Sequence, residues 1–126
     1  MKGALNEIDI KELVIDALDD LKALDVVCMD VSDKTEITDF MIVASGTSSR
    51  HVKSLATNVV AEAKEEGLQP IGIEGLDQGE WVLVDLNAVV LHVMQPQVRD
   101  FYDIESLWSL SVERKRQKEN EEGKTD

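Results

Sequence analysis

The sequence has one cysteine, two tryptophans, one tyrosine and two phenylalanines among its 126 residues. The lone cysteine, Cys28, cannot form a disulfide within the chain, which suits a reducing compartment and predicts a cytoplasmic location. No apolar run approaches the roughly 20 residues that a membrane helix needs. The N-terminus also lacks a basic start followed by an apolar core. We therefore expect neither a membrane span nor a targeting signal.

Positive charge is scarce, with 13 Lys and Arg residues against 26 Asp and Glu residues, and the formal net charge is −13. The excess of acid lies within residues 1–112, because the segment 113–126 holds basic and acidic residues in equal number. Bare phosphate backbone repels such a body, so we expect little direct contact with nucleic acid and a partner met through protein. The alternative is that the charge serves only solubility.

Residues for metal or catalytic chemistry are also few. His51 and His92 are the only histidines, and together with one cysteine they cannot form a Cys/His metal cluster. Glycine-rich phosphate loops of the G-x-x-x-x-G-K-[ST] and G-x-G-x-x-G types are absent, as is a G-x-S-x-G elbow. Glu74 and Asp85 are single carboxylates on separate predicted strands, whereas magnesium-dependent transfer needs two or three held together. We expect no cofactor, no metal and no enzymatic activity.

The hydrophobic pattern predicts one domain of helices and strands. Apolar residues recur at three- and four-residue spacing over 8–24, over a stretch that ends at Gly67, and over 98–108, which predicts three helices. Strands are predicted over 26–31, 39–45 and 70–75, followed by a hairpin with arms 79–86 and 89–94. The run 26–31 is typical of a strand covered on both faces, with Cys28 as a small core residue.

This order predicts an α/β (α+β) class: a single domain with a mixed five-stranded sheet flanked by helices. We expect the domain to occupy residues 1–112. Residues 113–126 form a charged tail that is too poor in apolar residues to fold.

The hairpin is the most informative stretch. With Asn87 and Ala88 as its turn, Trp81 lies opposite Met94, and alternate side chains point to opposite faces of the sheet. One face is aliphatic, and the other is mixed, with the members Trp81, Leu83, Asp85, Val90, His92 and Met94. A core needs only the aliphatic face, so the mixed face is the candidate functional surface.

The helix predicted over 98–108 continues this surface. Its inward stripe consists of Val98, Phe101, Ile104 and Trp108. Tyr102 lies off the stripe, beside Arg99 and Asp103, and is expected to be exposed near Trp81. Tyrosine, tryptophan, methionine and arginine are enriched in interface cores. For Trp81 itself, packing in the core and contact with a partner are equally plausible.

Several motifs resemble the Iojap family, the bacterial ribosomal silencing factors. They lie at 37–40, 44–52, 79–86, 92–94 and 99–108, in order and with suitable spacing. The chain departs from the family pattern at Asn87-Ala88, where Gly-Asp or a similar pair is usual. The resemblance implies a sheet like that of nucleotidyltransferases without their catalytic carboxylates. A metal-dependent nucleotidyltransferase-like enzyme is therefore the alternative function.

The resemblance also implies a function and a site. It implies a translational repressor that binds the large ribosomal subunit through ribosomal protein number fourteen and blocks joining of the small subunit, mainly under nutrient limitation. It further implies a homodimer in the free state. On the matching positions the partner-binding residues are Trp81 and Tyr102 as anchors, with Glu80, His92, Met94, Arg99 and Asp103 around them.

Overall fold

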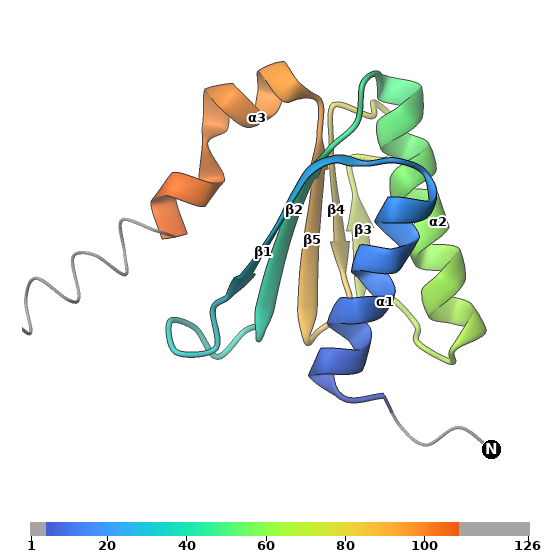
Figure 1. The fold of residues 1–126 in the computed structure, drawn as a ribbon, viewed down its shortest axis with the longest axis vertical. Helices are drawn as coiled ribbons and strands as arrows, with labels where there is room; N and C mark the ends of the chain where they lie inside the picture. Colours follow the sequence, from blue (N-terminus) through green and yellow to red (C-terminus); the bar gives the residue numbers. More distant parts are fainter. Residues whose placement is uncertain (1–4, 109–126) are drawn as a thin grey trace, which may run out of the picture.

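One mixed sheet with helices on both faces makes up the computed structural model, which describes residues 5–108 (Figure 1). The sheet has five strands in the order β1-β2-β5-β4-β3. Its central pair, β2 and β5, is parallel, and the other neighbours are antiparallel. The elements in chain order are α1 (Glu7–Asp20), β1 (Leu24–Asp30), β2 (Phe40–Ser45), α2 (Ser49–Glu65), β3 (Gly72–Glu74), β4 (Trp81–Asp85), β5 (Val89–Met94) and α3 (Pro96–Tyr102).

The predicted class, a single α+β domain with a mixed five-stranded sheet, is confirmed. The predicted boundary at residue 112 and the charged tail 113–126 lie outside the described residues. No helix within residues 5–108 is both long enough and apolar enough to cross a membrane.

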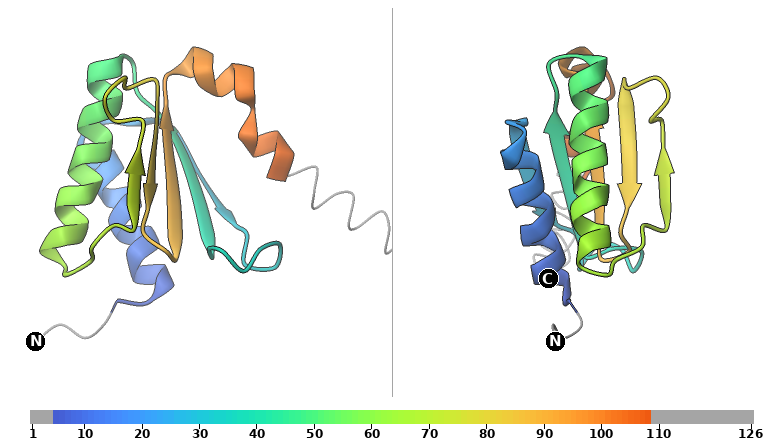
Figure 2. Two further views of the ribbon diagram at one scale, coloured as in Figure 1. Left: turned by 180° about the vertical axis from the view of Figure 1, so that it is seen from behind. Right: turned by 90° about the vertical axis from the view of Figure 1, so that its right-hand side faces the viewer.

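Two helices cover one face of the sheet and α3 packs on the other (Figure 2). The main core lies under α1 and α2 and includes the aliphatic face of the hairpin, which is buried as predicted: Val82, Val84, Leu86, Val89, Leu91 and Val93. Burying each such side chain contributes about 1.5–3 kcal/mol, so this layer holds the domain together. Asn58 Nδ2 donates to the Ala17 carbonyl at 2.8 Å and ties α2 to α1.

The hairpin has the predicted register, with Trp81 opposite Met94 and Asp85 opposite Val90. Its turn depends on Asn87, which has a φ of 71°. The Asn87 N–H donates to Asp85 Oδ1 at 2.8 Å, and the Ala88 N–H donates to the Leu86 carbonyl at 2.9 Å. Asn tolerates this left-handed conformation, so the unusual pair Asn87-Ala88 still closes a tight turn.

β1 differs from the sequence prediction. It is an edge strand with mostly exposed side chains, not a strand covered on both faces. Cys28 is exposed, so its predicted place in the core is wrong. The cause is the strand order: β1 pairs only with β2, and the helices cover the centre of the sheet instead of this edge. An apolar run alone does not tell an edge strand from a central one.

The first predicted helix also ends early, at Asp20 and not near Leu24. Lys22 has a φ of 59°, its N–H donates to the Asp19 carbonyl, and the Ala23 N–H donates to the Leu18 carbonyl. These two bonds form a Schellman ending without the usual glycine, so the sequence carried no stop signal.

The last predicted helix is interrupted. α3 ends at Tyr102, Asp103 is left-handed with a φ of 47°, and residues 104–108 are helical again. Phe101 is also not on an inward stripe: it is 80% exposed, and the buried residue of α3 is Arg99. The other predicted stripe members, Val98, Ile104 and Trp108, do pack against a second, smaller cluster. That cluster is built from Val31, Met41, Val43 and Met94.

Candidate partner-binding surface

Trp81 is fixed in place by His92 on the neighbouring strand. The Trp81 Nε1–H donates to His92 Nδ1 at 2.9 Å, and the two ring centroids are 5.9 Å apart. His92 is 8% exposed, and this burial lowers its pKa to about 4. Because tryptophan can only donate, His92 is neutral at neutral pH, with its proton on Nε2.

Three aromatic side chains lie in a row at this end of the sheet. The rings of Trp81 and Tyr102 are 4.9 Å apart, and those of Tyr102 and Phe101 are 5.0 Å apart in an edge-to-face arrangement. Trp81 is half-buried, whereas Tyr102 is 52% and Phe101 80% exposed. We call Trp81, Tyr102 and Phe101 the aromatic strip. In the strip, Trp81 is held by the fold, and the rings of Tyr102 and Phe101 face solvent.

A hollow of about 300 Å³ opens beside the strip, lined by Glu80, Trp81, Gln97, Val98, Phe101 and Tyr102. Gln95 joins the two sides of this hollow, because its backbone N–H donates to the Glu80 carbonyl at 3.0 Å and its Nε2 donates to the Gly79 carbonyl at 3.2 Å. Glu80 is exposed at the rim. The surface is therefore apolar at its centre and acidic at its edge.

Arg99 and Met94 lie beneath this surface. Met94 is fully buried in the second cluster. Arg99 is 9% exposed, so its expected place at the surface beside Tyr102 is corrected. Its guanidinium bonds to residues other than Asp103: Nε donates to Glu105 Oε1 at 2.6 Å, and Nη1 donates to Ser45 Oγ at 2.9 Å.

The structure thus sorts the seven residues predicted for the site into two layers. Four of them reach the surface around the strip: Glu80, Trp81, Tyr102 and Asp103. The other three, His92, Met94 and Arg99, are buried below. The sequence reasoning missed Phe101. The helical spacing placed Phe101 on one stripe with Val98, and the sequence carried no other signal for its exposure.

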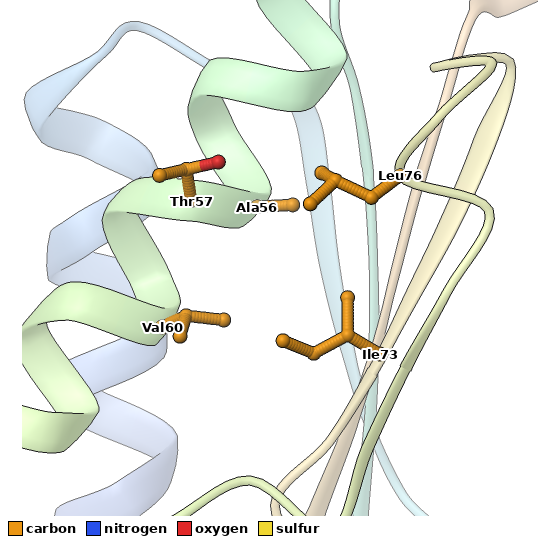
Figure 3. A pocket seen from close by; sticks show the side chains of 5 residues that line it. All are labelled: Ala56, Thr57, Val60, Ile73 and Leu76. Carbon is orange, nitrogen blue, oxygen red and sulfur yellow. The ribbon is translucent and has the colours of Figure 1, made fainter.

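A second hollow lies between α2 and β3. Ala56, Thr57 and Val60 of α2 face Ile73 and Leu76 across it (Figure 3), and its volume is about 100 Å³. Small-molecule sites usually measure roughly 300–1,000 Å³ and carry a few polar groups that orient the ligand. This slot is smaller and is lined by apolar side chains and one hydroxyl, so it offers nothing to hold the phosphates of a nucleotide.

The carboxylates and the thiol considered for catalysis are placed as follows in the part of the chain that the structure describes. Glu74 and Asp85 lie on neighbouring strands but out of register with each other. No cluster of three or more His, Cys, Asp or Glu residues suited to a metal ion occurs within residues 5–108. Partial desolvation raises the pKa of the Cys28 thiol, which disfavours the nucleophilic thiolate.

The loop before α2 serves folding. Ser48 caps the helix by accepting the His51 N–H at 3.1 Å. Gly46 is needed for packing, because an added Cβ would lie 2.9 Å from the Val52 backbone nitrogen. His51 Nδ1 accepts the Thr47 N–H at 2.9 Å, and Nε2 donates to the Leu21 carbonyl at 2.8 Å. His51, in the first turn of α2, therefore bonds both to this loop and to the residue that follows α1.

Comparison with known proteins identifies the family. The sequence model described as "Ribosomal silencing factor during starvation" matches residues 5–126. The chain belongs to the ribosomal silencing factor family. A ribosomal silencing factor from Chromobacterium violaceum is 51% identical over 100 residues, covering 79% of this chain and 82% of that protein. The resemblance to this family that the motifs indicated is confirmed.

Two further relatives bear on structure and role. A crystal structure of a C. violaceum protein aligns with a TM-score of 0.82 at 48% identity, covering 83% of this chain and 88% of that one. A mouse protein named "Mitochondrial assembly of ribosomal large subunit protein 1" is 32% identical over 111 residues, which are 86% of this chain and 47% of the mouse protein. The family takes its name from silencing ribosomes and not from a reaction.

Proposed function

We propose that this protein binds the large ribosomal subunit through ribosomal protein number fourteen and so blocks joining of the small subunit. It would repress translation in this way, mainly under nutrient limitation. One observation carries the proposal for this chain: a rigidly supported aromatic strip stands in solvent at one end of the sheet.

The strip has the properties of an interface centre. Binding energy at interfaces is concentrated in a few aromatic and arginine side chains with well-packed support. Trp81 has that support, because His92 holds its indole N–H from below and Tyr102 lies against its ring. Phe101 and Tyr102 leave apolar area in water that a partner would cover.

Charge supports a protein partner with a basic surface. The chain carries a net charge of −13, and two exposed carboxylates, Glu80 and Asp103, flank the strip. Ribosomal proteins are commonly basic, so attraction between the two surfaces would speed their encounter. The same charge disfavours contact with bare RNA, which explains why recognition would run through protein.

The buried residues of the site take part indirectly in this proposal. His92 fixes the orientation of Trp81, Met94 fills the space under it, and Arg99 holds α3 beside it. The name of the mouse relative, which refers to the ribosomal large subunit, supports the choice of the large over the small subunit as the binding partner.

The free protein would form a homodimer, because a strip with two exposed rings is costly to leave in water. It would act in the cytoplasm, where the ribosomes of a bacterial cell are found. Sedimentation equilibrium of the purified protein tests the dimer: a molecular mass of one chain at all micromolar concentrations would contradict it.

Binding to the large subunit can be tested by co-sedimentation. The protein is mixed separately with purified large and small subunits and pelleted through a sucrose cushion. We expect it in the pellet with the large subunit only, and the Tyr102→Ala variant should stay in the supernatant. Equal pelleting with both subunits, or with neither, would contradict the proposal.

A further inference from the structure

Arg99 is a buried charge that joins three separate segments. Its side chain is on α3, its Nη1 donates to Ser45 at the end of β2, and its Nε pairs with Glu105 in the segment 104–108. Ser45 is itself buried and lies beside Met94 in the parallel register of β2 and β5. The guanidinium therefore connects the sheet, α3 and the segment that follows α3.

The connection matters because the backbone between α3 and residues 104–108 is not a continuous helix. Asp103 is left-handed, and its N–H donates to the Arg99 carbonyl at 2.8 Å. The first helical bond after this break runs from the Ser106 N–H to the Asp103 carbonyl, at 3.2 Å. Beyond Asp103, the segment is held to the fold by Ile104 and Trp108 in the second cluster and by the pair of Glu105 with Arg99.

We propose that Arg99 is a positioning residue that sets the shape of the aromatic strip. Phe101 and Tyr102 lie two and three positions after Arg99 on α3, so the angle at which α3 meets the sheet decides whether Tyr102 lies against Trp81. The role of the strip as a contact surface rests on the proposed function. The clamp formed by Ser45, Arg99 and Glu105 is a property of the free protein and can be measured without a ribosome.

Arginine suits this position better than lysine. The Nε and Nη1 donors of the planar guanidinium reach two different acceptors at once, whereas the ammonium of lysine is a single point charge on a flexible chain. Because Arg99 is buried, loss of either partner would leave its charge incompletely compensated and destabilise the fold. Substitution of Glu105 should destabilise the fold less than substitution of Arg99, because the Glu105 side chain is 27% exposed.

Amide hydrogen exchange on the free Glu105→Gln variant tests the clamp. Gln can still accept from Arg99 but lacks the negative charge, so the bond is weakened and not abolished, and we expect amides of residues 103–108 to exchange roughly three- to tenfold faster. The amides of β5 should keep their protection, because a general loss of stability would speed exchange everywhere. Asp100→Asn removes a carboxylate from α3 outside the clamp and should change neither set. Unchanged exchange at 103–108 in Glu105→Gln would overturn the proposal.

The shape of the strip has its own readout. In the parent protein, NMR should show nuclear Overhauser effects between the rings of Trp81 and Tyr102, which lie 4.9 Å apart. These effects should weaken in Glu105→Gln and in Arg99→Lys, and stay in Asp100→Asn. If they persist at full strength in both clamp variants, Arg99 does not position the strip. A parent protein that fails to bind large subunits would refute the proposed function alone, because both measurements on the free protein stand apart from it.

Discussion

Of the three residues in the strip, Phe101 is the one whose substitution should change partner binding with the least effect on the free energy of unfolding. Its side chain is 80% exposed, so folding buries only a small part of the ring. Complete burial of such a side chain is worth about 1.5–3 kcal/mol, and a fifth of that is about 0.5 kcal/mol. Adding a weak edge-to-face contact with Tyr102, we expect Phe101→Ala to lower the free energy of unfolding by less than about 1 kcal/mol.

The expected effect on binding is much larger. Truncating an aromatic anchor at the centre of an interface costs about 2–4 kcal/mol, which corresponds to an increase in Kd of roughly thirtyfold to a thousandfold. Thermal melting and a fluorescence titration against isolated ribosomal protein number fourteen measure the two quantities on the same sample. Since Trp81 belongs to the strip and its ring lies against Tyr102, its emission should report the encounter directly.

Ile37→Ala is the matched control. Ile37 is 79% exposed, nearly the same fraction as Phe101, but it lies in the loop between β1 and β2 and outside the strip. It should bind the ribosomal protein with the parent Kd. If Phe101→Ala also binds like the parent, the exposed rings are not the contact surface and the reasoning from exposure fails.

Three further predictions concern the rest of the site and the tail. Tyr102→Ala should weaken binding to the ribosomal protein by a similar factor and barely change the Tm. Trp108→Ala should keep the Kd and lower the free energy of unfolding by roughly 3 kcal/mol, because Trp108 packs against the second cluster. Thermal melting and titration of both variants measure the two quantities. Burial holds the pKa of His92 at about 4 in the folded protein, below its usual 6.5. The unfolded chain therefore takes up the proton at a higher pH than the folded protein, and the stability that comes from neutral His92 is lost as the pH falls from about 6.5 to 4. The parent should lose about 2–3 kcal/mol more than His92→Gln between pH 7 and pH 4.5 in urea unfolding, and equal losses would show that His92 titrates normally. Truncation after Val112 should leave subunit binding and Tm nearly unchanged, because the segment removed has few apolar residues and balanced charge; a large loss of either would assign the tail a role.

Local rules were enough to predict the hairpin. A two-residue connection fixes which residues face each other, and alternation then fixes the faces, so both the buried aliphatic layer and the place of Trp81 beside β5 followed from the sequence. The exposure of Tyr102 followed from the helical wheel in the same way. Each of these features depends on residues close together in the chain.

The features that were wrong depend on distant partners or on a single backbone angle. The exposure of Cys28 follows from β1 being at the sheet edge, which is decided by the pairing of β2 with β5. Arg99 is buried because Ser45, 54 positions away, accepts its hydrogen bond. Asp103 turns left-handed and divides the predicted helix, and α3 turns Arg99 instead of Phe101 toward the sheet. No periodicity in the sequence reports these three events.

The central claim is that this protein keeps the ribosomal subunits apart, and a subunit-joining assay tests it most directly. Purified large subunits are incubated with saturating protein, small subunits are added, and the mixture is resolved on a sucrose gradient. We expect the peak of joined ribosomes to fall and the peaks of free subunits to rise. Tyr102→Ala or Phe101→Ala should restore joining, whereas Ile37→Ala should not. An unchanged peak of joined ribosomes with the parent protein at saturation would contradict the claim.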